Sequence, residues 1–290
     1  ISGKYDQSPG GKEKRMKTIY IDCQMGAAGD MLMGALLELV PDQEGFLERL
    51  NQAGIPGISV EAQKSVKCGI TGTHMSVLVK GEEEESLDVS REVKPLESEH
   101  DHEQVHHHHH SHGHDHGHHH HSHFSMEDIT RIIDSLNVED KVKEDVKNIY
   151  QIIAQAESQV HGRSVAEVHF HEVGAMDAVA DITGCAMLFH ELGAEKIMAS
   201  PVTTGYGQVR CAHGILPVPA PATALILQGI PCQAGRIEGE LCTPTGAALV
   251  KYFAGEYGRM PEMIMEKIGY GMGKKDFEAA NCIRAILGEE

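Results

Sequence analysis

Residues 167–181 read EVHFHEVGAMDAVAD, and the rest of the chain is interpreted outward from this stretch. Its first half alternates as a β-strand does, so Glu167, His169 and His171 are expected on one face. Gly174 ends the alternation, and the residues after it have the composition and spacing of a helix. The stretch therefore predicts a strand, a sharp turn and a helix.

The predicted helix covers residues 175–192 and places Asp177 and Asp181 one turn apart on one face. Imidazoles and carboxylates gathered at one corner suit nickel, zinc, iron or manganese, and geometry would choose among these metals. A structural role is equally open, because Asp177 can favour the helix dipole and buried histidines often bond backbone groups. The residues predicted to bind metal are His169, His171, Asp177, Asp181 and Asp22.

Two loops have the pattern of anion sites. Residues 26–30 join a strand predicted at 18–23 to a helix predicted at 31–40, and N–H groups and the helix dipole point into such a junction. The loop fits neither a Walker motif nor GxGxxG, and Asp22 and Asp30 would also suit a hydrated cation. The alternative for Asp30 is a helix N-cap. The residues predicted to bind the ligand here are Gly26, Gly29 and Asp30.

The second loop covers residues 243–246, where Thr243 can cap a helix that has Pro244 at its first position. Thr243 and Thr245 are therefore predicted to bind an anion. Upstream, residues 211–221 contain alternate prolines, which predict an extended segment along an edge or a cleft. His213 in that segment is either a site residue or a surface histidine.

The remaining pattern predicts an α+β fold, with mixed sheets and packed helices. A helix over 44–53 and a hairpin of strands 58–67 and 74–80 complete an N-terminal β-α-β-β unit of ferredoxin-like type. Further helices are predicted at 126–136, with Ser125 and Asp128 as a capping box, and at 139–160. A strand at 196–202, a glycine-rich turn at 269–273 and a final strand at 281–287 follow.

Histidine dominates residues 100–123, where it occupies 15 of 24 positions among Gly, Ser and Asp. Such a segment cannot build a core, so we predict a disordered loop that binds nickel, zinc or copper without catalysing a reaction. The predicted organisation is a disordered extension over 1–15, an N-terminal α+β unit over 16–95, the His-rich loop over 96–124 and a main α/β core over 125–290.

Composition limits the partners. A formal net charge of −18 argues against nucleic acid and anionic membranes. Seven cysteines without a CxxC pair predict reduced thiols and a cytoplasmic location. No apolar run reaches membrane-spanning length.

The chain resembles the LarC family, which inserts nickel into the pincer cofactor of lactate racemase, and the resemblance runs from Lys17 to Glu290. The segments that carry it are residues 20–23 with 26–31, the internal His tract, and residues 168–181, 211–221, 238–247 and 269–277.

The resemblance implies a nickel chelatase, or cyclometallase, of the lyase class. It would act on pyridinium-3,5-bisthiocarboxylic acid mononucleotide, form one nickel–carbon and two nickel–sulfur bonds, and consume CTP. Full-length members carry a further C-terminal domain, associated with CTP and with Mg or Mn, and this chain stops where that domain would begin. In this chemistry His171 or His213 would be the catalytic base that removes the ring proton.

Other functions remain open. A non-enzymatic nickel store or metallochaperone would use the His tract alone, and a metal-dependent phosphohydrolase would use Asp22, Asp30, Asp177 and Asp181. The expected partners are the nucleotide-like substrate, a separately encoded C-terminal domain, the sulfur-transfer enzyme or lactate racemase of the pathway, and further copies of this chain in a homo-oligomer.

Overall fold

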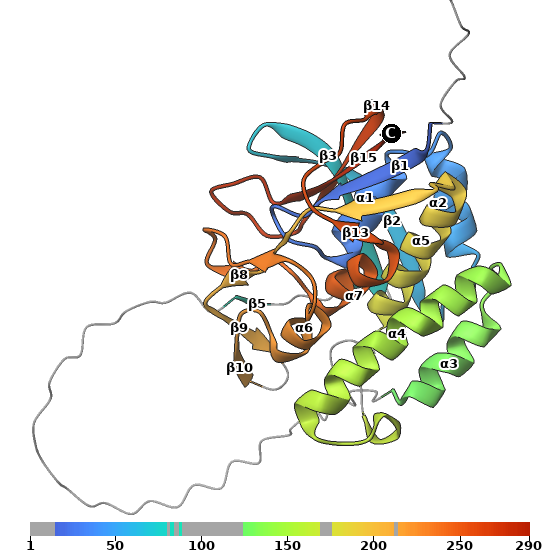
Figure 1. The fold of residues 1–290 in the computed structure, drawn as a ribbon. Coiled ribbons are helices and arrows are strands. Elements are labelled where there is room, and N and C mark those ends of the chain that lie inside the picture. Colours follow the sequence, from blue (N-terminus) through green and yellow to red (C-terminus); the bar gives the residue numbers. More distant parts are fainter. Residues whose placement is uncertain (1–14, 80–81, 84–86, 89–123, 169–175, 212–213) are drawn as a thin grey trace, which may run out of the picture.

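The computed structural model describes residues 15–79, 82–83, 87–88, 124–168, 176–211 and 214–290. Within these residues an α+β fold forms, as predicted, from one large mixed sheet, three small sheets and a layer of helices (Figure 1). No helix in this part of the chain is both long enough and apolar enough to cross a bilayer.

Eight strands form the large sheet, in the order β13-β6-β1-β15-β14-β3-β2, with β4 beside β3. Strands β1, β6 and β13 are parallel, whereas β15 is antiparallel to both β1 and β14. The strand bounds are β1 Lys17–Asp22, β2 Ile58–Lys67, β3 Ile70–Val79, β4 Glu82–Glu83, β6 Lys196–Ala199, β13 Glu256–Tyr257, β14 Ile264–Met272 and β15 Cys282–Glu289.

The small sheets are formed by short strands that follow β6 and by one strand from earlier in the chain. Strand β9 (Gln208–Cys211) pairs with β10 (Gly214–Pro217) and with β5 (Leu87–Asp88). The other two pairs are β7 (Val202–Thr203) with β11 (Cys232–Gln233), and β8 (Gly205–Tyr206) with β12 (Gly239–Glu240).

The helices are α1 Gly29–Leu37, α2 Gln43–Asn51, α3 Met126–Ser135, α4 Asp140–His161, α5 Met176–Leu192, α6 Pro221–Ile226 and α7 Pro244–Phe253, with a 3-10 turn, η1, at Val165–Glu167. Helix α1 packs directly on β14, β15 and β3, α5 packs on α1, and α4 with α3 lies outside α5. Asp145 of α4 accepts hydrogen bonds from His190 of α5 and Tyr252 of α7, which ties these three helices together.

Chain direction brings three helix starts to one edge of the sheet. Helix α1 follows β1 directly, so it begins near the carboxyl end of that strand. Helices α5 and α7 lead directly into β6 and β13, which run parallel to β1, so they begin at the same edge. Strand β14 also ends there, because both β14 and β1 are antiparallel to β15. Ligands of open α/β sheets commonly bind at this edge.

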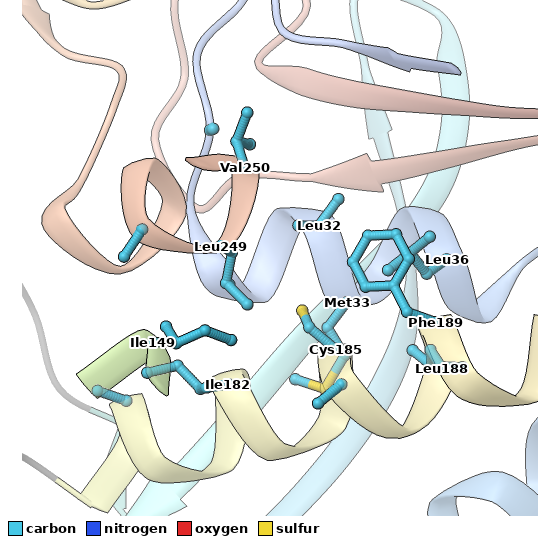
Figure 2. Close-up of a cluster of buried hydrophobic side chains, with 14 of the residues drawn as sticks. Leu32, Met33, Leu36, Ile149, Ile182, Cys185, Leu188, Phe189, Leu249 and Val250 are labelled. Carbon is cyan, nitrogen blue, oxygen red and sulfur yellow. The ribbon is translucent and has the colours of Figure 1, made fainter. Parts of the chain in front are cut away.

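The core lies between the sheet and the outer helices. Figure 2 shows its centre, where α1, α5 and α7 meet beside α4, through the side chains Leu32, Met33, Leu36, Ile149, Ile182, Cys185, Leu188, Phe189, Leu249 and Val250. Each fully buried aliphatic side chain contributes roughly 1.5–3 kcal/mol to stability. The helix predicted at 139–160 forms as α4 and buries an apolar face in this core, through Val142, Val146, Ile149 and Ile153.

The predicted N-terminal caps of helices α3 and α7 are confirmed. The Ser125 side chain accepts the Asp128 N–H, and the Asp128 carboxylate bonds the Ser125 N–H, which completes the predicted capping box. Thr243 caps α7 by accepting the Gly246 N–H, with Pro244 in the first turn. The predicted hairpin also forms, with a tighter turn at Cys68 and Gly69.

Two predictions are wrong. Residues 269–272 are not a turn but the end of β14, and a Cβ on Gly269 or Gly271 would overlap carbonyl oxygens of α1. These glycines therefore allow a helix to approach a strand closely. Glu167 is not on a strand either: it ends η1 and its carboxylate bonds the Ser164 N–H and hydroxyl. That bonding lowers the pKa of Glu167.

The His-rich segment predicted at 96–124 separates two predicted units along the sequence, but the strands on either side of it belong to one sheet. Strands β1–β4 precede that segment and β6, β13, β14 and β15 follow it, yet all belong to one sheet. Strands β15 and β14 lie between β1 and the β2–β3 hairpin, so the N-terminal strands do not form a separate ferredoxin-like sheet.

Candidate functional site

The two loops predicted to bind anions lie against each other at the carboxyl edge of β1. The Ala27 N–H donates to the Leu241 carbonyl oxygen at 3.0 Å, and the Thr243 N–H donates to the Ala27 carbonyl oxygen at 3.0 Å. A Cβ on Gly26, whose φ is +92°, would overlap the Leu241 carbonyl. A Cβ on Gly246 would likewise overlap Ala27. The glycines permit this close backbone contact, which brings the starts of α1 and α7 together.

A carboxylate from another helix caps the start of α1. Ala28 stands at the N-cap and has no side chain that could accept an α1 N–H. The Asp181 carboxylate of α5 lies against Gly29 and bonds the Asp30 N–H instead. A Cβ on Gly29 would lie 2.4 Å from Asp181 Oδ2, so glycine is needed here for this approach. Asp30 is thus not the N-cap, but it lies in the first turn of α1.

Asp30, Asp177 and Asp181 form an acidic cluster between α1 and α5. Burial raises the pKa of Asp181 well above its usual range, and the neighbouring charges of Asp30 and Asp177 raise it further. Its Oδ1 has less than 1 Å² of accessible area and no hydrogen-bond partner among the described residues. Such a group is either protonated or compensated by a cation.

Two further side chains border this acidic cluster. Burial, followed by the charges of Asp177 and Asp181, raises the pKa of Tyr150, and burial, followed by Asp181 and Asp30, raises that of Cys185. Neither residue was predicted from the sequence. Cys185 continues the four-residue spacing of Asp177 and Asp181, which is a usable signal, whereas Tyr150 comes from α4 and has no local one.

The acidic cluster does not complete a metal site by itself. In the part of the chain that the structure describes, no group of three or more His, Cys, Asp or Glu side chains has a geometry suited to holding a metal ion. The predicted ligands His169 and His171 and the predicted base His213 lie outside the described residues. In the sequence, His169 and His171 come shortly before the first residue of α5.

The other predicted residues lie nearby in different environments. Asp22 ends β1, is 8% exposed, and accepts hydrogen bonds from Arg284 Nη2 at 2.6 Å and from the Gln24 N–H at 3.3 Å. The structure therefore pairs Asp22 with Arg284. Thr243 is occupied as the cap of α7, and Thr245 lies half-buried in the first turn of that helix.

The family model for "Nickel insertion protein" matches residues 19–290. The chain is 45% identical over 276 residues to the pyridinium-3,5-bisthiocarboxylic acid mononucleotide nickel insertion protein of Clostridium acetobutylicum, covering 95% of this chain and 64% of that protein. It is 41% identical over 280 residues to the protein of that name from Clostridium kluyveri, covering 95% and 63%. A putative nickel insertion protein of Dictyoglomus thermophilum is 37% identical over 274 residues, covering 94% and 61%.

No solved structure matches the chain. The chain spans somewhat more than three fifths of the length of these curated relatives. The family match covers nearly the whole chain, including both loops and the acidic cluster. The chain therefore belongs to the nickel insertion protein family.

Proposed function

We propose that this protein acts in the insertion of nickel into pyridinium-3,5-bisthiocarboxylic acid mononucleotide, as a nickel chelatase. Relatives that are 37–45% identical carry this function in their names. The observation that supports it most is the cluster of Asp30, Asp177 and Asp181, in which Asp181 Oδ1 is inaccessible and lacks a partner among the described residues. A divalent cation would compensate the buried charge of this cluster.

Carboxylate and imidazole ligands fit a metal ion that the protein delivers to a substrate and does not keep. Nickel must be released to the organic substrate, and carboxylates and imidazoles release it more readily than a closed cysteine site does. We assign Asp177 and Asp181 as nickel ligands, with His169 and His171 as the partners that complete the set. Asp22, held by Arg284, would act from the neighbouring strand end.

The organic substrate would lie along residues 26–30 and 243–246, where Gly26, Gly29, Asp30, Thr243 and Thr245 line the joined loops. Formation of the nickel–carbon bond removes a proton from the pyridinium ring. His171 or His213 would accept that proton, because a neutral imidazole titrates near physiological pH. The two thiocarboxylate sulfurs then complete the coordination of nickel.

Further elements of the proposal rest on the family resemblance. CTP, with Mg or Mn, would act through a C-terminal domain, the sulfur-transfer enzyme would supply the precursor, and lactate racemase would receive the product. Self-association of the chain and a cytoplasmic location belong to the same proposal. The free thiols of all seven cysteines are compatible with a reducing compartment.

The experiment compares nickel-dependent stabilisation in three proteins that all lack residues 100–123, so that the His tract does not mask the core site. We expect nickel to raise the melting temperature of the parent, whereas Asp181→Asn abolishes that rise. Asp134→Asn removes a surface carboxylate of α3 that pairs with Lys147, so it is the control and should behave as the parent. Equal stabilisation of all three proteins would place the nickel site elsewhere.

The same proteins separate the competing functions. A nickel store loses nearly all bound nickel once residues 100–123 are removed, whereas a chelatase retains a tight site. A phosphohydrolase releases phosphate from esters without transferring nickel to the precursor. Mass spectrometry of the precursor after incubation with nickel distinguishes these outcomes directly.

A further inference from the structure

Helix α1 takes its N-terminal cap from a neighbouring helix and not from its own sequence. Ala28 stands at the N-cap position, where Ser, Thr, Asp or Asn commonly accept a hydrogen bond from the first turn. Helices α3 and α7 have such caps in Ser125 and Thr243. At α1 the Asp181 carboxylate bonds the Asp30 N–H instead. The start of α1 therefore binds a carboxylate that comes from outside the helix.

The two oxygens of that carboxylate have different environments. A Cβ on Gly29 would lie 2.4 Å from Asp181 Oδ2, which places Oδ2 against the start of α1. Oδ1 has less than 1 Å² of accessible area and no hydrogen-bond partner among the described residues. The bond to the Asp30 N–H is therefore made by Oδ2, and Oδ1 is left for the metal that the proposed function assigns to Asp181.

The substrate of the proposed function carries groups that match this arrangement. A thiocarboxylate has the planar shape and the negative charge of a carboxylate, with sulfur in place of one oxygen. Its oxygen is the stronger hydrogen-bond acceptor, and its sulfur is the softer metal ligand. The pyridinium ring is positively charged, so the neighbouring carboxylates of Asp30 and Asp177 attract it. Such a substrate can place oxygen on the Asp30 N–H and sulfur on the metal.

Other contacts hold α1 and α5 together without the Asp181 carboxylate. Figure 2 shows the two helices packed side by side in the core. Cys185 Sγ of α5 donates to the Gly29 carbonyl oxygen at 3.6 Å. A Cβ on Gly184 would lie 2.3 Å from Met33 Sδ, so the helices are also in close contact further along. The Asp181 side chain can therefore leave the Asp30 N–H while the start of α1 stays in place.

We propose that a thiocarboxylate of the pyridinium substrate replaces the Asp181 carboxylate at the start of α1 during nickel transfer. Its oxygen accepts the Asp30 N–H, its sulfur binds nickel, and the bond between Asp181 Oδ1 and nickel breaks. One anionic ligand replaces another, so nickel stays divalent and no oxidant or reductant is needed. The inference rests on the proposed function and adds to it the group that receives the thiocarboxylate. Alanine at position 28 fits this role, because a Ser or Asp cap would compete for the same N–H.

The test measures the binding of two probes to the metal-free full chain, nicotinic acid mononucleotide and nicotinamide mononucleotide. Both are pyridinium mononucleotides, and they differ only in a carboxylate against a carboxamide. Asp181→Ala vacates the Asp30 N–H, so we expect it to bind the carboxylate probe at least about tenfold more tightly than the parent does, since hydrogen bonds to charged groups are the strong ones. Affinity for the carboxamide probe should change by less than about twofold.

Asp181→Asn is the matched control, because it removes the same carboxylate but keeps an amide oxygen that accepts the Asp30 N–H. It should gain at most about twofold for the carboxylate probe. Adding Ala28→Ser to Asp181→Ala gives α1 a cap of its own and should reverse the gain. Circular dichroism checks that each variant is folded. If Asp181→Ala is not, Asp181→Ser replaces it, because the serine hydroxyl is too short to reach that N–H.

Each result decides the inference. Equal gains in Asp181→Ala and Asp181→Asn would show that the probe responds to the lost charge and not to the vacated N–H, which overturns the inference. Equal gains for both probes would identify an enlarged cavity and also overturn it, as would no gain at all. The proposed function is judged separately, because loss of nickel-dependent stabilisation in Asp181→Asn supports it whatever the probes do. If nickel does not stabilise the parent, the proposed function fails even where the probes bind as expected.

Discussion

At the scale of single residues, Asp181 links helix capping to the proposed metal chemistry. Its carboxylate bonds the Asp30 N–H at the start of α1, and it also faces the charges of Asp30 and Asp177. Capping favours the ionised form, but burial and the two like charges oppose it more strongly, so the pKa of Asp181 is raised. The raised pKa predicts that the metal-free protein holds a proton at Asp181 at pH values where the unfolded chain has released it.

The first prediction concerns the pH dependence of metal-free stability. A raised folded-state pKa gives a stability contribution that is complete below the unfolded pKa of about 4 and is lost as pH rises through the folded pKa. Asp181→Asn keeps an oxygen to accept the Asp30 N–H and carries no charge. We expect urea unfolding to give similar stabilities for parent and variant near pH 4, with the variant more stable near pH 8.

Asp134→Asn is the matched control, because its carboxylate lies 57% exposed on α3. The unfolding free energy of Asp134→Asn should not rise relative to that of the parent as the pH increases from about 4 to about 8. Parallel pH profiles for the parent and Asp181→Asn would mean that Asp181 is ionised in the metal-free protein. The acidic cluster would then be compensated by a cation already bound, or by groups outside the described residues.

At the scale of elements, the packing of α1 on β14 fixes the position of the site. Gly269 lies under Ala35 and Gly271 lies under Met31, so the helix runs antiparallel to the strand at backbone contact distance. The Glu38 carboxylate at the end of α1 accepts the Tyr270 N–H at 2.9 Å, and Lys267 donates to the Leu39 carbonyl oxygen at 2.7 Å. These contacts hold the start of α1 beside the carboxyl end of β14.

The second prediction is that Gly271→Ala destabilises the fold by about 3 kcal/mol, the upper part of the range for overpacking, because the new Cβ meets backbone that cannot move aside easily. The control is Gly258→Ala, where a Cβ would have no atom within 4 Å and where about 0.5 kcal/mol or less is expected. Denaturant unfolding measures both. Equal, small changes would show that α1 can shift away from β14 without cost.

These elements also show how far the sequence could predict the structure. Helix starts were predictable because a cap and its partner are three residues apart, as at Ser125 and Asp128. Gly269 and Gly271 were misread as a turn, since the reason for glycine there is Met31 and Ala35, more than two hundred residues earlier in the chain. A local pattern cannot distinguish a turn glycine from one that allows close packing.

The same limit applies to the candidate site. The four-residue spacing of Asp177 and Asp181 predicted a shared helix face, and the helix is confirmed. Nothing local shows that Asp30, about 150 residues earlier, joins them, or that Arg284 pairs with Asp22 from the far end of the chain. The roles of His169, His171 and His213 remain predictions, because these residues lie outside the described part of the chain.

At the scale of the whole molecule, the chain combines a part in which helix starts and carboxylates meet at one sheet edge with a histidine-rich segment of unusual composition. The segment contains 15 histidines in 24 residues and no large apolar side chain apart from Val105. The number of nickel ions bound per chain and the insertion reaction are therefore expected to depend on different parts of the chain. A variant that changes the number of bound ions and leaves insertion intact tests this expectation.

The third prediction is that replacing the 15 histidines of residues 100–123 by serine lowers the number of nickel ions bound per chain but leaves nickel insertion intact at saturating free nickel. A segment that cannot form a core cannot hold a transition state in place, so its contribution should be limited to supplying metal.

Deletion of the segment shortens the connection between residues 88 and 124 from 35 to 11 residues. By loop-closure entropy this should stabilise the fold by about 1 kcal/mol, whereas the serine variant should melt as the parent does. Equilibrium dialysis, precursor mass spectrometry and thermal unfolding measure the three quantities. Loss of insertion in the serine variant at saturating nickel would show that these histidines take part in the chemistry itself.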